Sequence, residues 1–164
     1  MKINQKIKKV AFIGMGLINS SLARDLKIKK FYLSSSAYSR RPSTINKIKK
    51  LKLVDFASSN IEKTIKEADI IIVGIPVAAY QEVFKKICNN IKPGTIITDV
   101  GSVKKEVINS VKKYIPKNID FVPGHPIAGT ENSGPESGFA GLFKNGWCIF
   151  CLLYTSDAAD DQAC

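Results

Sequence analysis

The feature that most constrains this chain is an apolar run that breaks at two glycines and continues as a helix-like pattern. Val10–Ile13 are apolar without interruption, as is typical of a strand buried in a parallel sheet. Gly14 and Gly16 follow with the spacing Gly-x-Gly. Apolar residues then recur at helical intervals, at Leu17, Ile18, Leu22 and Leu26. A strand, a glycine turn and a helix in this order are typical of a dinucleotide-binding site.

The residues of this turn suit a bound pyrophosphate. Gly14 permits a tight turn, and Gly16 has no side chain, so an anion can approach the backbone closely. The first helical amides, beginning at Leu17 and Ile18, would point at that anion, assisted by the helix dipole. The third fingerprint position is usually glycine or alanine but is Asn19 here, and we expect local widening. An ordinary strand-to-helix turn would share these residues, so the glycines alone leave both interpretations open.

Strand-like and helix-like patterns alternate along the chain. After the first strand and helix, we expect strands at residues 33–39, 54–57, 69–75, 95–100 and 119–122. Helices are expected at residues 42–52, 61–67, 78–90 and 102–114, the last of them capped by Ser102. This alternation predicts an α/β domain over residues 1–150, a doubly wound, mostly parallel Rossmann-type sheet with helices on both faces. Ligands of such sheets bind at the carboxyl ends of the strands, which places Ile75 and Pro76 beside the expected cofactor.

The residues after the second strand favour NADP over NAD. An NAD site normally has an acidic residue about 20 positions after the glycines, where it holds the ribose hydroxyls. Here no Asp or Glu occurs between Asp25 and Asp55, and the expected position holds Ser39, Arg40 and Arg41. An arginine fork pairs with a phosphate, and nearby hydroxyls add hydrogen bonds. The alternative is that both arginines are solvated loop residues.

Composition narrows the class of partner. The net charge is +11, but 22 of the 25 basic residues are lysines scattered over polar helix faces. Base and phosphate recognition favours arginine, so we expect a solvated surface and no nucleic-acid partner. No apolar run approaches the roughly 18 residues of a membrane span, and no signal-peptide cleavage site follows the first apolar run. We therefore expect a cytoplasmic protein without membrane association.

The cysteines do not indicate a metal site. Cys148 and Cys151 have the spacing of a metal or redox pair, but the chain contains no second pair. The only histidine is not beside them, and they lie in an apolar, strand-like run. We predict no bound metal and cysteines that are reduced and structural.

Two further motifs stand at predicted strand ends. Residues 99–104 read Asp-Val-Gly-Ser-Val-Lys, and residues 124–134 read Gly-His-Pro-Ile-Ala-Gly-Thr-Glu-Asn-Ser-Gly. The glycines and prolines of the second motif predict a shaped, rigid loop. His125 is the only histidine, so any imidazole chemistry of this chain belongs there.

Together with residues 14–18, these two motifs resemble the prephenate/arogenate (cyclohexadienyl) dehydrogenases of tyrosine biosynthesis. The resemblance runs from about Lys8 to Ile149, and the run Ser39–Thr44 also resembles members of that family that prefer NADP. It implies oxidative decarboxylation of prephenate or arogenate, in which a hydride leaves the carbon that bears the ring hydroxyl. By the same resemblance, His125 would take the hydroxyl proton, Ser102 would orient the reacting groups, and Glu131 would lie near the pocket mouth.

Purely structural interpretations of these residues also remain open. Ser102 could be an ordinary helix N-cap, Glu131 a solvated carboxylate, and Asp99 is expected to be structural. A non-catalytic dinucleotide-binding module is the alternative function.

The resemblance also implies parts that lie beyond this chain. Members of the family continue into a helical domain that supplies dimer contacts and grips the substrate carboxylates, so we expect a homodimer for the full-length form. Residues 151–164 contain three aspartates and no basic residue, and they depart abruptly from the family pattern. We expect this tail to be non-native, such as a translated adapter or a chimeric reading frame.

Overall fold

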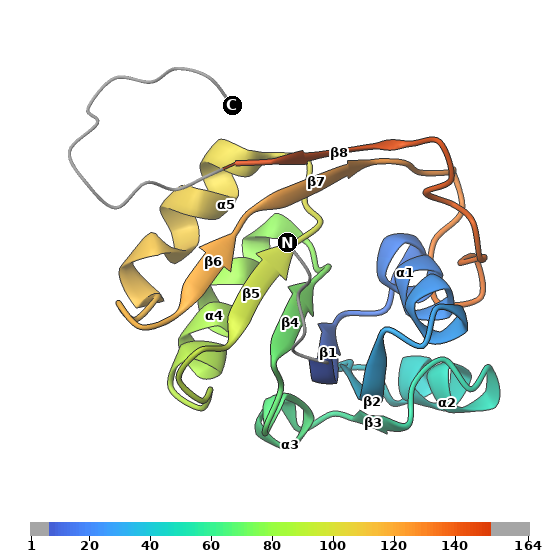
Figure 1. Ribbon diagram of the computed structural model, residues 1–164, viewed down its shortest axis with the longest axis horizontal. Coiled ribbons are helices and arrows are strands. Elements are labelled where there is room, and N and C mark those ends of the chain that lie inside the picture. The colour runs from blue at the N-terminus through green and yellow to red at the C-terminus, as the bar shows by residue number, and fades with distance from the viewer. Residues whose placement is uncertain (1–6, 152–164) are drawn as a thin grey trace.

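The computed structural model describes residues 7–151, which form a six-stranded parallel sheet and a separate two-stranded hairpin (Figure 1). The sheet order is β3-β2-β1-β4-β5-β6, and every neighbouring pair is parallel. Its strands are β1 (Ile7–Ile13), β2 (Tyr32–Tyr38), β3 (Phe56–Ser58), β4 (Ile70–Val73), β5 (Ile96–Asp99) and β6 (Asp120–Val122). The order reverses direction beside β1, as in doubly wound dinucleotide-binding folds, so the predicted fold class is confirmed.

Helices cover both faces of the sheet. They are α1 (Leu17–Ile28), α2 (Pro42–Lys50), α3 (Ile61–Ile65), α4 (Tyr80–Cys88) and α5 (Lys104–Val111), with short 3-10 turns η1 (Val77–Ala79) and η2 (Lys112–Tyr114). Side chains alternate along β1, so Ala11 and Ile13 join one core and Val10 and Phe12 join the other. The first core lies under α3, α4 and α5, and the second lies under α1 and α2.

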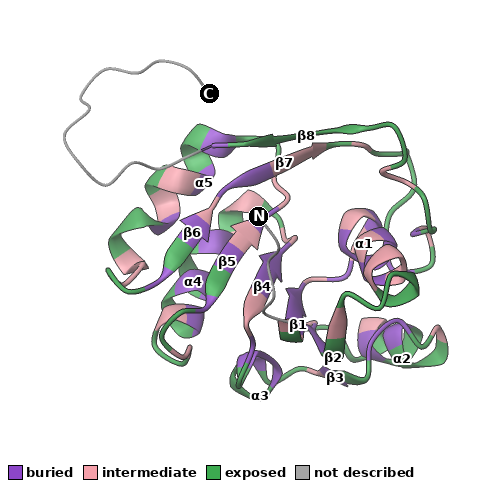
Figure 2. Cartoon of the chain, in the orientation of Figure 1, coloured by how far each residue is buried: buried purple, intermediate pink, exposed green. Residues whose placement is uncertain are grey.

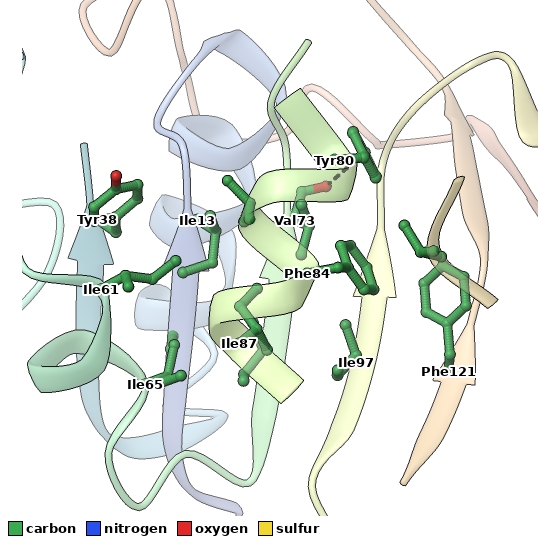
Figure 3. Packing of buried hydrophobic residues seen from close by; sticks show 14 of the residues in the cluster. Ile13, Tyr38, Ile61, Ile65, Val73, Tyr80, Phe84, Ile87, Ile97 and Phe121 are labelled. Carbon is green, nitrogen blue, oxygen red and sulfur yellow. Dashed lines mark hydrogen bonds between the residues drawn. The ribbon is translucent and has the colours of Figure 1, made fainter. Parts of the chain in front are cut away.

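The apolar face of α4 packs on the sheet (Figure 3). Tyr80, Val83, Phe84 and Ile87 are all buried there. The rings of Tyr80 and Phe84 stack with centroids 5.8 Å apart, and Phe84 meets Phe121 of β6 edge-on at 5.3 Å. Figure 2 shows the same pattern for the whole fold, with buried residues on the central strands and on the helix faces turned toward them.

The hairpin was not predicted. Strands β7 (Gly124–Ile127) and β8 (Trp147–Phe150) pair antiparallel, with His125 opposite Ile149. The prediction that residues 124–134 form only a loop is therefore wrong for its first four residues. Pro123 breaks β6 from β7, and its carbonyl accepts the Cys151 amide at 3.0 Å, which closes the base of the hairpin. Figure 1 shows the hairpin running above the sheet from the α5 side toward α1.

Several predicted elements are shorter in the structure. Most differences are one to three residues at an end, where the ladder stops before a glycine or a turn begins. Among residues 7–151, no helix combines the length and apolar character that a membrane crossing needs. The predicted non-native tail falls almost wholly on residues 152–164, which lie outside the described part of the chain.

Candidate functional site

The two glycines of the first turn do different work. Gly14 has a φ of +82°, and a Cβ there would lie 2.4 Å from the carbonyl oxygen of Gly74, so only glycine fits. Its amide donates to Tyr38 at 3.0 Å and continues the ladder toward β2. A Cβ on Gly16 would meet nothing within 4 Å, so the space above Gly16 is open. Gly14 is therefore required by the fold, whereas the open space at Gly16 can admit a ligand.

Asn19 fits beside the sheet because Gly74, directly after β4, has no side chain. Its side chain is buried, and its amide nitrogen donates to the carbonyl of Gly14 at 2.8 Å. A Cβ on Gly74, just after β4, would lie 2.7 Å from that nitrogen. Asparagine is larger than the glycine or alanine usual at this position. The missing side chain of Gly74 leaves the space that the larger residue occupies.

The start of α1 opens into a cleft of about 250 Å³, here called the helix cleft. It is lined by Gly16, Leu17, Ile18, Asn19, Gly74, Ile75, Pro76, Val100 and Gly101. No side chain caps the first turn of α1, and that turn contains no acidic residue. The leading amides and the positive end of the helix dipole are therefore available to an anion.

A second cleft, of about 380 Å³, adjoins the first and holds both predicted arginines. This arginine cleft shares Gly16, Gly74, Ile75 and Pro76 with the helix cleft. Ser39, Arg40, Arg41 and Thr44 line its far side. No Asp or Glu stands among the described residues that line it. The arrangement can hold an extended anion whose far end carries a further negative group.

Sequence reasoning did not place Gly74, Gly134 and Pro135 at the arginine cleft, which all three line. Gly74 follows a strand and precedes Pro76, a signal that could have identified it. Gly134 and Pro135 arrive from far along the chain, and nothing local indicates where they return. They belong to residues 128–146, which connect β7 with β8 and are here called the strap.

The strap is fastened to the helices that flank the cleft. Lys47 of α2 and Glu136 form an ion pair at 2.6 Å. The Phe139 amide donates to the Ser21 hydroxyl at 3.1 Å, and the Gly141 amide donates to the Asp25 carboxylate at 2.8 Å. Between these contacts Gly138 lies directly against α1, where a Cβ would come 2.0 Å from the Ser20 hydroxyl oxygen. The strap thus joins the histidine-bearing hairpin to the rim of the arginine cleft.

The residues predicted to act on substrate lie outside both clefts. His125 is half-buried on β7, whereas Ser102 and Glu131 are exposed. None of the three lines the helix cleft or the arginine cleft. Gly101, the neighbour of Ser102, does line the helix cleft, so the Ser102 loop lies beside it.

The prediction that Ser102 caps α5 is wrong. The helix begins at Lys104 with Val103 at the cap position, and no side chain bonds to its first amides. The Ser102 hydroxyl forms no hydrogen bond with any residue of the described range. Ser102 lies one residue before the cap position, because the first turn of α5 starts at the buried residue Lys104.

Lys104 pairs with Asp99 in the buried centre of this edge. The two form an ion pair, and the Asp99 carboxylate also accepts the amides of Gly101 at 2.8 Å and Gly124 at 3.2 Å. The Tyr80 hydroxyl donates to the same carboxylate at 3.2 Å. Burial, followed by the Asp99 charge, raises the pKa of Tyr80, so Tyr80 remains a neutral donor. The expected structural role of Asp99 agrees with this geometry.

A larger apolar cavity of about 670 Å³, here called the hairpin cavity, separates the hairpin from α1. Gly124, Pro126, Cys148 and Phe150 line it from the hairpin side, and Leu22 and Leu26 line it from α1. Alternation along β7 directs His125 to the opposite face from Gly124 and Pro126.

Two cysteine thiols in the described part of the chain have a raised pKa. Burial raises the pKa of the Cys88 thiol to about 11 and also raises the pKa of the Cys148 thiol, so the reactive thiolate form is disfavoured at both residues. Among the described residues, no group of three or more His, Cys, Asp and Glu side chains could hold a metal ion.

Comparison with known sequences identifies a family. The family model described as the prephenate dehydrogenase nucleotide-binding domain matches residues 22–162. The cyclohexadienyl dehydrogenase of Zymomonas mobilis is 38% identical over 138 residues, which are 84% of this chain and 47% of that protein. The prephenate dehydrogenase of Lactococcus lactis is 34% identical over 146 residues, 87% of this chain and 40% of that protein. The chain thus spans less than half the length of these curated relatives.

Solved structures agree in fold. Prephenate dehydrogenase from Aquifex aeolicus, in complex with hydroxyphenyl propionate and NAD⁺, superposes with a TM-score of 0.84 at 27% identity, over 94% of this chain and 54% of that chain. Synechocystis arogenate dehydrogenase superposes with a TM-score of 0.78 at 30% identity, over 87% of this chain and 49% of that chain. With its glycine turn, doubly wound sheet and paired clefts, this chain belongs to the family of prephenate dehydrogenase nucleotide-binding domains.

Proposed function

We propose that this chain is the cofactor-binding half of an NADP-dependent prephenate or arogenate dehydrogenase of tyrosine biosynthesis. The matched relatives are named for these activities and are about twice as long as this chain. In this proposal residues 1–150 form the nucleotide-binding domain. A further helical domain completes the substrate site and forms a homodimer in the full-length protein.

The cofactor arrangement carries the proposal. Its single strongest support is the pair of adjoining clefts that share Gly16 and end at Arg40 and Arg41. In the proposed arrangement the pyrophosphate lies over Gly16 at the start of α1, against the amides of Leu17 and Ile18. Ile75 and Pro76 line both clefts and would contact the cofactor where the two clefts meet.

The choice of NADP over NAD depends on the far end of the arginine cleft. Arg40 and Arg41 are exposed beside Ser39 and Thr44. Their guanidinium groups can pair with a 2′-phosphate, and the hydroxyls of Ser39 and Thr44 can donate further hydrogen bonds to it. The Aquifex aeolicus relative was solved with NAD⁺. The preference proposed for this chain therefore rests on its own two arginines and on the absence of a carboxylate among the residues described around that cleft.

His125 is the proposed base. A bound nicotinamide would accept a hydride from the substrate carbon that bears the hydroxyl. In this proposal His125 takes the hydroxyl proton as that hydride leaves, and loss of carbon dioxide makes the ring aromatic. Ser102 lies next to Gly101 at the edge of the helix cleft, a position from which it can orient the hydroxyl. Glu131 is proposed to lie at the pocket mouth.

The experiment that tests this function is an activity assay of a chimera in which a second domain is joined to this chain. Residues 1–150 would be continued by the second half of the Zymomonas mobilis relative, and NADPH formation would be measured with prephenate and with arogenate. We expect substrate-dependent NADPH formation, and we expect His125→Asn to lower kcat by about 100- to 10,000-fold. NADPH affinity, measured on the same variant, should stay within about twofold, since His125 lines neither cofactor cleft. Cofactor binding without any substrate-dependent turnover would instead identify a non-catalytic binding module.

A further inference from the structure

We propose that the buried Asp99–Lys104 ion pair is a positioning device for His125 and Ser102. It fixes the backbone immediately before each of them, at Gly124 and at Gly101. The inference deepens the proposed function and rests on it for the meaning of the two positioned residues. Its physical content, the immobilisation of two peptide groups, can be measured without any activity.

The contacts on Gly124 come from both partners of the pair. The Gly124 amide donates to one oxygen of Asp99 at 3.2 Å, and the Gly124 carbonyl accepts from the Lys104 ammonium at 2.7 Å. Both polar groups of this residue are therefore held by opposite charges, and His125 is the next residue of the chain. Rotation of the peptide before His125 would break at least one charge-assisted hydrogen bond.

The second contact fixes the other loop. The Gly101 amide donates at 2.8 Å to the Asp99 oxygen that also accepts from Lys104 and from the Tyr80 hydroxyl. Ser102 follows Gly101 directly. One carboxylate thus receives donors from α4, α5, the loop after β5 and the first residue of β7, so it sets the separation between the Ser102 loop and β7.

Close packing makes this hold specific. A Cβ on Gly124 would lie 2.8 Å from the Asp99 carbonyl oxygen, and a Cβ on Gly101 would lie 3.0 Å from the Asp99 carboxylate. Neither glycine therefore has room for a side chain unless Asp99 or the loop shifts. A side chain at either position would push its loop away from the carboxylate.

Stability alone gives a weak reason for this pair. Asp99 is 1% exposed and Lys104 is 7% exposed, and the desolvation of two such charges can exceed the attraction between them. A buried ion pair of this kind is better explained by the geometry that it imposes. The same chain offers a second ion pair for comparison near the amino ends of the strands, with its side chains 25% and 33% exposed. There Asp69 pairs with Lys92 at 2.6 Å and accepts the amides of Lys8 and Lys9, remote from His125.

The test compares charge-neutral double variants of these two pairs. Asp99→Asn/Lys104→Met removes the proposed positioning pair, and Asp69→Asn/Lys92→Met removes the control pair. Amide hydrogen exchange at Gly101 and Gly124 is measured by NMR, together with the ring resonance of His125. Because the chain contains one histidine, that resonance needs no further assignment.

We expect exchange at both glycine amides to accelerate by about tenfold or more in the first variant, with a displaced or broadened His125 resonance. The control variant should leave both unchanged. Equal changes in the two variants, or none in the first, would overturn the proposal. If the first variant does not fold, amide exchange in the unmodified chain tests the proposal instead. Slow exchange at Gly101 and Gly124 supports the positioning role, and rapid exchange at either contradicts it.

Addition of NADPH to the same samples separates this proposal from the proposed function. If the unmodified chain does not bind NADPH, the cofactor assignment fails while the exchange data still report on the ion pair. If NADPH binds but exchange at Gly124 and Gly101 does not depend on the pair, only the positioning role fails.

Discussion

At the scale of single residues, the two glycines of the first turn separate folding from binding. Gly14 is required by its positive φ and by its approach to Gly74, whereas Gly16 faces open space. Sequence alone identifies both glycines but does not say which one the fold needs. The distinction depends on the position of Gly74, which directly follows β4 and is distant in the sequence.

This difference predicts opposite effects of the same substitution. Gly16→Ala should cost about 1 kcal/mol or less of stability, as expected for alanine in place of glycine at a helix N-cap, while weakening NADPH binding by at least about tenfold. Gly14→Ala should destabilise the fold by roughly 2 kcal/mol or more, because strain and a clash combine. Thermal unfolding and NADPH titration of both variants measure the two effects. Unchanged NADPH affinity in folded Gly16→Ala would remove the pyrophosphate from this turn.

The ionisation of Asp69 is expected to make the stability of the fold depend on pH. Burial alone would raise its pKa, but hydrogen bonds from Lys92, Lys9 and Lys8 outweigh it and lower the pKa below its ordinary value. A carboxyl group with a lower pKa in the folded state contributes stability that is complete above its unfolded pKa. That contribution is lost as the pH falls through the folded pKa.

We therefore expect Asp69→Asn to lower the free energy of unfolding by about 1 kcal/mol at pH 7. The difference from the unmodified chain should shrink as the pH falls below about 4. Urea unfolding between pH 7 and pH 2 measures it, with Asp120→Asn as an exposed control. A difference that stays constant over this range would contradict the role of the Asp69 charge.

At the scale of elements, the sequence predicts what is local and misses what returns from a distance. The six parallel strands and the buried face of α4 follow from apolar runs and helical periodicity, which are local signals. The hairpin was missed because Gly124 and Pro126 favour a loop, and because the partner strand β8 lies beyond the strap. Likewise, nothing near Asp99 in the sequence indicates that its carboxylate would hold the peptide before His125.

The strap gives the prediction that belongs to this scale. Gly138 leaves no room for a side chain, since a Cβ would lie 2.0 Å from the Ser20 hydroxyl oxygen. Gly138→Ala should lift the strap from α1 and cost roughly 1 to 3 kcal/mol. Gly129→Ala is the matched control, because a Cβ there meets nothing within 4 Å. Chemical unfolding compares the two, and equal stabilities would show that the strap does not dock on α1 as described.

At the scale of the whole molecule, the residues proposed to bind cofactor and substrate gather where the parallel strands end. Gly16 lies after β1, the arginines after β2, Ile75 after β4, Gly101 after β5 and His125 beyond β6. The strap then carries the chain from the hairpin back to the arginine cleft. The carboxyl ends of the strands therefore carry both the proposed cofactor site and the proposed catalytic base.

The most direct test of this account is a fluorescence titration of the chain with NADPH and with NADH. We expect NADPH to bind about 10- to 100-fold more tightly, since charge-assisted hydrogen bonds from two arginines would hold its extra phosphate. Arg40→Ala should remove most of that preference, whereas Lys49→Ala, which removes an exposed charge from α2, should not. NADH binding as tight as NADPH binding, and unaffected by Arg40→Ala, would contradict the central claim.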